Sequence, residues 1–361
     1  MEKLDKLLLV PFAFLVFLGS VMVFSASANV YSTGNLTLFF KHILWVTIGC
    51  GLLLFTLIIP VEAYQKYIYL MLFVVLILLV ILFIPGVGRT VKGAKRWISF
   101  SFIQFQPSFL AKWVLLVFIA SSLSKKVPEK IKSFKKGILP YLIILGVLGI
   151  LFLKEPDYGG FVVITAMSVI MLIIAGTRIR YWFLMGLIAA PFFVYMIYSK
   201  SYRLNRLLAF TDIWKYSQTY SYQIVQSLLS FAAGGLTGAG IGQGKQKLLF
   251  LPEAHTDFIF AVIGEELGFI GAFLVVICFL VIALRGFYIA IKLSENLYLC
   301  YLACGMTLFI TFEALFNIAV SVCLAPPKGL PLPFLSYGGT AMLTYMASMG
   351  ILLNLSRRAR E

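Results

Sequence analysis

Residues 7–27 read LLLVPFAFLVFLGSVMVFSAS, an uncharged apolar run that follows Lys3 and Lys6. A run of about 20 apolar residues is long enough to cross the hydrocarbon core of a bilayer as one helix. Similar runs recur along the chain, in which 61% of the residues are hydrophobic and only 12% are charged, whereas soluble domains carry about 25% charged residues. The sequence therefore predicts an all-α, polytopic membrane protein with one transmembrane domain over residues 1–361.

Ten such runs predict about ten transmembrane helices. They cover residues 7–27, 42–60, 67–85, 109–123, 138–153, 160–176, 183–199, 258–283, 297–320 and 338–355. Basic residues concentrate on the cytoplasmic side of membrane proteins, and the lysines within residues 125–136 are the strongest such signal. An even number of spans then places both termini in the cytoplasm. The connection 200–257 becomes a large extracytoplasmic loop between helices 7 and 8, which should be folded and lie partly on the membrane surface.

The net charge of +16 does not indicate a nucleic-acid partner, because the chain has no soluble module to present basic residues to a duplex. Many basic residues lie outside instead, where the charge rule expects few. These outward residues gather at Arg89, Lys92, Lys95, Arg96, Arg203, Arg206, Lys245 and Lys247. An anionic ligand outside the membrane explains this excess better than ordinary solvated loop charge. A zinc site is not expected, because the chain has only two histidines and no CxxC pair.

Asp257 is the strongest candidate for an acid–base residue. It directly precedes the predicted span 258–283, near the water boundary, where a carboxylate can exchange protons. A partly desolvated aspartate can act as a general base near neutral pH. Glu265 and Glu266 should lie one to two turns deeper in the same helix, and we interpret them as structural partners of buried polar groups. The glycines of residues 234–244 indicate a tight, irregular backbone near a ligand or another helix.

Two segments resemble the signatures of a bacterial membrane-protein family. One is LPEAHTDFIFA at residues 251–261 with EELG at 265–268, and the other is KGLPLPFLSYGG at 328–339. On these motifs the chain is identified as a member of the SEDS family, the shape, elongation, division and sporulation proteins. Smaller blocks that also match, in order along nearly the whole chain, are residues 93–98, 106–108, 155–157 and 222–227. The signatures are most similar to the division branch, FtsW, with the elongation branch, RodA, as the alternative.

The resemblance implies a ten-helix fold and a peptidoglycan glycosyltransferase. Such an enzyme polymerises lipid II into β-1,4 glycan strands at the outer face of the cytoplasmic membrane, here during septal cell-wall synthesis. Asp257 matches the family's essential aspartate. The implied partners are lipid II, a glycan on undecaprenyl pyrophosphate, a class B penicillin-binding protein transpeptidase and other membrane proteins of the divisome. A lipid II flippase and a non-catalytic scaffold for the transpeptidase remain the alternatives.

Candidate substrate-binding residues follow from the resemblance and from the outward basic charge. They are Arg96, Lys112, Asp157, Arg203, Arg206, Lys245, Lys247, His255 and Ser336. The cations among them would stabilise the departing pyrophosphate. No tightly bound cofactor is expected, although a divalent cation, Mg²⁺ or Mn²⁺, would suit the phosphates of the substrate.

The chain departs from the family pattern at two places. Phe109 stands where the family usually has a glutamate that lines the cavity together with a lysine and an aspartate, here Lys112 and Asp157. Without that glutamate, we expect Lys112 to pair with Asp157. Glu313 stands where glutamine is common, and residues 323–327 replace a Gly-Leu-Leu/Met-Pro-Thr run, so a different loop geometry is expected there.

Overall fold

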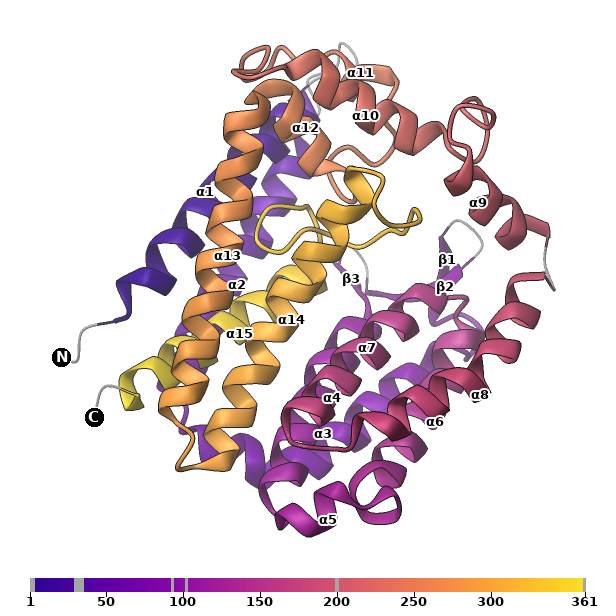
Figure 1. The fold of residues 1–361 in the computed structure, drawn as a ribbon. Coiled ribbons are helices and arrows are strands. Elements are labelled where there is room, and N and C mark those ends of the chain that lie inside the picture. The colour runs from indigo at the N-terminus through magenta and orange to yellow at the C-terminus, as the bar shows by residue number, and fades with distance from the viewer. Residues whose placement is uncertain (1–3, 29–35, 92–93, 101–102, 199–200, 360–361) are drawn as a thin grey trace.

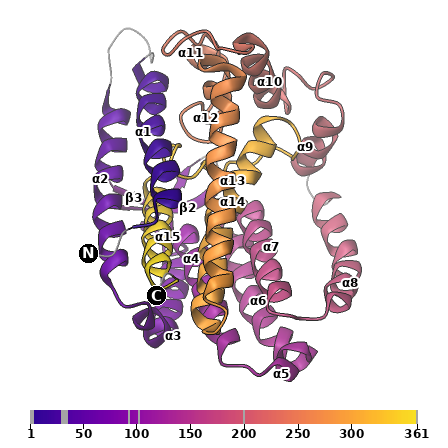
Figure 2. The same cartoon turned by 60° about the vertical axis from the view of Figure 1, so that its left-hand side comes forward.

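In the described part of the chain, ten long helices run side by side and form a bundle (Figures 1 and 2). The computed structural model describes residues 4–28, 36–91, 94–100, 103–198 and 201–359. The long helices are α1 (Lys6–Ala28), α2 (Thr37–Ile58), α3 (Val61–Ile81), α4 (Pro107–Ser124), α6 (Leu139–Lys154), α7 (Tyr158–Ile174), α8 (Ile179–Tyr198), α13 (Gly268–Lys292), α14 (Leu297–Ser321) and α15 (Gly339–Arg358). Each overlaps one of the predicted spans, so the polytopic helical fold is confirmed.

Seven helices in the described part of the chain are long and apolar enough to cross a membrane by themselves. They are α1 to α4, α6 with the π-helical turn η1 (Phe134–Ile138), α13 and α14. α7 and the first part of α8, Ile179–Pro191, are shorter apolar helices.

α15 is less hydrophobic and is buried along almost its whole length, mainly against α2. Small residues allow the two helices to approach closely. A β-carbon on Gly350 would lie 2.4 Å from the Leu53 carbonyl oxygen, and one on Gly49 would lie 2.9 Å from the Met346 side chain. Close backbone approach of this kind is the usual basis of helix packing in membranes.

The predicted eighth span, 258–283, starts ten residues too early, because a first helix ends at Glu266 and the spanning helix begins at Gly268. Residues Ile259–Glu266 form a short helix, α12, and α13 starts afresh at Gly268, which has a φ of +67°. Glycine adopts this left-handed backbone without the steric cost that a side chain brings. The chain therefore reverses, and α12 runs beside the first turns of α13 in the opposite direction (Figure 1). α13 spans with its own 25 residues.

The connection between α8 and α12 is folded, as predicted. It contains α9 (Ser201–Thr211), α10 (Tyr222–Gly234) and α11 (Gln246–Leu249). We call the end of the bundle formed by residues 201–257 the loop end (top of Figure 1). At the other end, the short helix α5 (Pro128–Lys132) joins α4 to η1.

Short strands that precede α4 form a small antiparallel sheet, which the all-α prediction did not include. Its strands are β1 (Gly88–Val91), β2 (Ala94–Phe100) and β3 (Ile103–Phe105), in the order β1-β2-β3. Arg89 lies opposite Trp97, and Ile98 lies opposite Phe105. The sheet leads directly into α4, so it holds Arg96 close to the start of that helix.

Candidate functional site

The two signature segments of the sequence pack against each other. The Ser336 hydroxyl donates to the Thr256 carbonyl oxygen at 2.6 Å and accepts from the Leu332 backbone N–H at 2.7 Å. The Tyr337 N–H donates to the His255 carbonyl oxygen at 2.9 Å. The segment 328–337 therefore fixes the backbone on both sides of the loop that carries Asp257.

Asp257 is half-buried at the junction of these segments. Its carboxylate lies against Gly329, where an added β-carbon would be 2.5 Å from Asp257 Oδ2. Gly329 itself is exposed, so the carboxylate sits beside an open edge of the protein. This is the combination of partial desolvation and access that a general base needs.

The side chain of Asn317, on α14, bridges the two signature segments through hydrogen bonds. Its amide nitrogen donates to the Asp257 carbonyl oxygen at 2.8 Å and to the Leu330 carbonyl oxygen at 2.5 Å. The side chain is 1% exposed, and a buried backbone carbonyl without a partner is costly. One amide thus holds the Asp257 backbone and the residue after Gly329 at a fixed separation.

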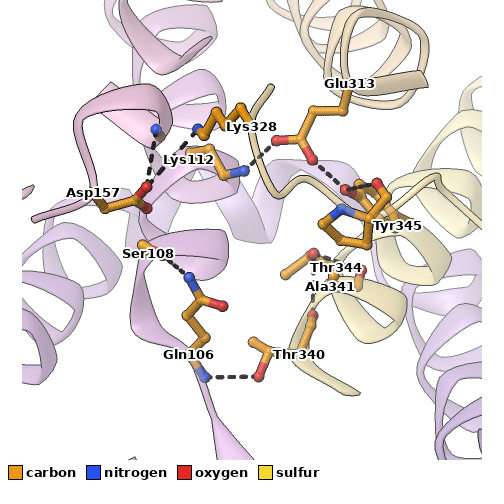
Figure 3. Close-up of polar contacts among 12 residues, drawn as sticks. Gln106, Ser108, Lys112, Asp157, Glu313, Lys328, Thr340, Ala341, Thr344 and Tyr345 are labelled. Atoms are coloured by element: carbon orange, nitrogen blue, oxygen red, sulfur yellow. Dashed lines mark hydrogen bonds and ion pairs between the residues drawn. The ribbon is translucent and has the colours of Figure 1, made fainter. Parts of the chain in front are cut away.

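Glu313, one turn before Asn317, binds Lys112 of α4 and Tyr345 of α15 (Figure 3). The Lys112 and Glu313 side chains are 2% and 0% exposed. The Lys112 ammonium also lies 3.9 Å from the centre of the Phe109 ring, a cation–π contact. The expected pair of Lys112 with Asp157 is therefore wrong, because Glu313 supplies the carboxylate that position 109 lacks.

Asp157 pairs instead with Arg96 at 3.8 Å. It also pairs with Lys328 at 3.9 Å (Figure 3). It is the N-cap of α7, and its Oδ1 accepts from the Gly160 N–H at 3.1 Å. Burial raises the pKa of Asp157, but the positive charges around it, Lys328 foremost, lower it further, so the net shift is downward. Asp157 is therefore a stable anion.

Glu155 differs from its neighbour Asp157. It is 0% exposed, and both carboxylate oxygens lack a hydrogen-bond partner among the described residues. Burial, followed by the charge of Asp157, raises the pKa of Glu155 to about 8. The Arg96 guanidinium donates to the backbone carbonyls of Glu155 and Pro156 rather than to this carboxylate. Glu155 is therefore mostly protonated near neutral pH.

Glu265 and Glu266 are internal structural partners, as interpreted. Glu265 Oε1 accepts from the backbone N–H groups of Lys245 and Gln246 at 2.6 and 3.1 Å. Glu266 binds Lys247, the Ser25 hydroxyl and the Gly242 N–H. Their expected depth was wrong: because α12 runs toward the loop end, they lie at the glycine-rich loop and Asp257 lies at the inner end of α12 (Figure 1).

Lys247 is not available to a ligand, contrary to its prediction as a substrate-binding cation. Its side chain is 0% exposed and its charge is compensated by Glu266. Lys245 keeps an exposed side chain, while its backbone holds Glu265.

Of the remaining predicted site residues, Ser336 and His255 are described by the structure, whereas the side chains of the others are not. Ser336 is 2% exposed and its hydroxyl is used within the fold, so it positions backbone. The His255 ring is half-buried, 6.0 Å from the ring centre of Tyr337. The side chains of Arg203 and Arg206, on the described backbone of α9, and all of Lys92 lie outside the part that the structure describes.

Asn317 and Lys328 were missed as site residues. The signal for Asn317 was present, because a polar residue four positions after Glu313 lies on the same helix face. Lys328 lies in the second signature segment, but the sequence analysis predicted no role for it.

Comparison with known proteins agrees with this arrangement. The family model described as "Cell cycle protein", which covers FtsW, RodA and SpoVE, matches residues 5–361. The chain belongs to this family. The SEDS resemblance of the motifs is therefore confirmed over the described bundle and both signature segments.

Several members of the SEDS family are similar over almost their full length. The probable peptidoglycan glycosyltransferase FtsW of Trichlorobacter lovleyi is 41% identical, with 99% of this chain and 94% of that protein covered. The protein of the same name from Geobacter sp. strain M18 is 39% identical, with 99% and 98% covered. The stage V sporulation protein E of Bacillus subtilis is 36% identical, with 99% and 98% covered.

Two solved structures share the fold. A chain from a peptidoglycan synthase complex, described as coordinating polymerization and crosslinking, has a TM-score of 0.81 at 25% identity and covers 99% of this chain and 98% of its own. The rod shape determining protein RodA of Thermus thermophilus has a TM-score of 0.71 at 25% identity, with the same coverage.

Proposed function

We propose that this protein polymerises lipid II into β-1,4 glycan strands outside the cytoplasmic membrane, with Asp257 as the general base. The protein is a multi-pass membrane protein and a peptidoglycan glycosyltransferase, since its SEDS relatives of 39–41% identity carry that name. Those relatives are named FtsW, which favours a role in septal wall synthesis over elongation. A donor glycan on undecaprenyl pyrophosphate and an acceptor lipid II would be its substrates.

In this mechanism Asp257 takes the proton from the 4-hydroxyl of the acceptor's terminal sugar. The oxygen attacks the anomeric carbon of the donor, a C–O bond forms, and the bond from that carbon to the pyrophosphate breaks with inversion. A positioned base contributes roughly 10²–10⁴-fold to such a reaction. The observation that carries the assignment is the clamp around Asp257, in which Asn317 and Ser336 fix the backbone while the carboxylate faces the exposed Gly329.

The topology proposal follows from the order of the helices. Among the residues that the structure describes, seven long helices precede residue 200. A cytoplasmic amino terminus would therefore place the loop end and Asp257 outside, with both termini inside. Labelling of single cysteines introduced at exposed sites of the loop end, by a reagent that does not cross the membrane, tests this. Labelling only after the cells are opened would place Asp257 in the cytoplasm and exclude the proposed chemistry.

The proposal also includes protein partners and a divalent cation. A class B penicillin-binding protein would crosslink the strands, together with other divisome proteins, since a related chain was solved in a peptidoglycan synthase complex. Mg²⁺ or Mn²⁺ would accompany the substrate's pyrophosphate. The described residues contain no group of three or more His, Cys, Asp or Glu side chains that could hold a metal ion by themselves.

The decisive experiment supplies labelled lipid II to the protein purified with its transpeptidase partner, and compares wild type with Asp257→Asn. Glycan polymer should form with wild type and fall by at least 100-fold in the variant. Asp212→Asn is the matched control, because Asp212 is an exposed carboxylate of the same loop end. Equal polymer from Asp257→Asn would exclude the base assignment. Lipid II crossing vesicle membranes without any polymer would favour a flippase instead.

A further inference from the structure

Lys328 is a buried amine without a hydrogen-bond acceptor among the described residues. Its nearest carboxylate is Asp157, at 3.9 Å from Oδ1, which is an ion-pair distance but too long for a hydrogen bond. The stem of the side chain fills the space beside Gly159, where a β-carbon would lie 2.1 Å from Lys328 Cδ. An ammonium carries three donors, and leaving them unsatisfied in a buried place is costly. Such a group calls for a specific explanation.

The charges around Lys328 leave a positive excess. The groups that face it are Asp157 at the start of α7, Arg96 on β2, Lys112 on α4 and Glu313 on α14. With Lys328 itself, three cations stand against two carboxylates. Glu155 does not correct the balance, because its raised pKa of about 8 keeps it mostly protonated at neutral pH. A partly desolvated cluster with one surplus positive charge favours an anion.

Lys328 also lies next to the residue that touches the proposed base. Its neighbour Gly329 is exposed and contacts the Asp257 carboxylate. Arg96, which shares Asp157 with Lys328, keeps 32% of its side chain exposed. Lys328 therefore adjoins the exposed Gly329 through the backbone, and its amine shares Asp157 with the partly exposed Arg96.

We propose that Lys328, with Arg96, binds the pyrophosphate of the polyprenyl-linked substrate, and that Asp157 holds both cations in place. This assignment rests on the proposed glycosyltransferase chemistry and adds the site of the leaving group to it. Phosphate oxygens would supply the acceptors that Lys328 lacks. The Lys112–Glu313 pair beneath them is already neutral, so it supports the site without binding the anion.

The test measures binding rather than turnover, so that it does not depend on Asp257. Affinity for undecaprenyl pyrophosphate is determined in detergent micelles for wild type, Lys328→Met and Lys328→Arg. Loss of hydrogen bonds to a charged group should weaken binding roughly 10- to 100-fold in Lys328→Met, and Lys328→Arg should recover most of it. Lys154→Met is the control, because Lys154 is an exposed lysine at the end of α6, and its affinity should equal that of wild type.

Two outcomes would overturn the assignment. One is unchanged affinity in Lys328→Met. The other is equal competition by phosphatidylglycerol, which would mean that the cluster takes any anionic lipid headgroup. If Lys328→Met is poorly folded, Lys328→Gln replaces it, and a loss of thermal stability that Lys328→Arg does not rescue would show a structural role only. Failure of the base assignment is separate, because Asp257→Asn should still bind undecaprenyl pyrophosphate and lose it on the additional Lys328→Met change.

Discussion

Replacing Glu313 with glutamine should strongly destabilise the protein, and a second change should repair it. Glu313 and Lys112 are fully buried and paired, and Glu313 also accepts from the Tyr345 hydroxyl. Removing one charge leaves the other buried and uncompensated, which costs about 3–5 kcal/mol. Glutamine has nearly the same shape as glutamate, so the loss would come from the charge and not from a cavity.

A substitution at Phe109 should compensate for the loss of the Glu313 charge. Its ring centre is 3.9 Å from the Lys112 ammonium, and it precedes Lys112 by three residues on α4, so the two side chains share a helix face. A carboxylate at position 109 can therefore reach the amine. Phe109→Glu combined with Glu313→Gln should recover at least half of the lost stability, whereas Phe109→Glu alone should not stabilise the protein, since the amine already has a partner.

The measurement is the free energy of unfolding, from titration of the purified protein with SDS in mixed micelles. Lys112→Met, Glu313→Gln and their combination complete a double-mutant cycle. Partners in direct contact should show a coupling of about 0.5–3 kcal/mol, so the double variant should lose less than the two single variants together. Additive losses, or no rescue by Phe109→Glu, would refute the reasoning that Glu313 is the counter-ion of Lys112.

Two further changes test the contact between Gly329 and Asp257 and the raised pKa of Glu155. Gly329→Ala should displace the Asp257 carboxylate, because the new β-carbon would lie 2.5 Å from Oδ2; polymer formation should fall at least tenfold with little change in thermal stability, and full activity would argue against this contact. Glu155→Gln should flatten the dependence of stability on pH. Because the pKa of Glu155 is raised to about 8 in the folded protein, its contribution is complete below its unfolded pKa and is lost as pH rises through 8. Wild-type thermal stability should therefore decline over that window more than the variant's, and parallel curves would contradict the shift.

Hydropathy and motif order were sufficient for the bundle. Runs of about 20 apolar residues satisfy every backbone hydrogen bond within one helix, which is the condition for crossing a bilayer. For this reason the ten long helices could be placed from local sequence. The structural role of Glu265 and Glu266 was also predictable, because buried carboxylates require partners.

The break between α12 and α13 was not predictable from hydropathy. Residues 258–283 have the composition of one continuous span, and nothing in their apolar pattern marks the reversal. The reversal depends on Gly268 at positive φ and on contacts with Gly235 and Leu236, whose carbonyls accept from the Phe269 and Ile270 N–H groups. Those partners lie more than 30 residues away in the chain, so only the folded structure brings them together.

The sequence by itself determined the membrane class and the family, and it singled out Asp257 for the proposed role of base, because each depends on local composition or a short motif. Only the tertiary structure decided which charges meet. Lys112 pairs with Glu313, 201 residues away, and Lys247 forms a buried ion pair with Glu266. Both lysines had been predicted to bind the substrate. An ion pair depends on side chains from different helices arriving at the same depth, and one sequence does not encode that depth in any local pattern. The positions of the long helices thus followed from the sequence, whereas the partners of the buried charges followed from the fold.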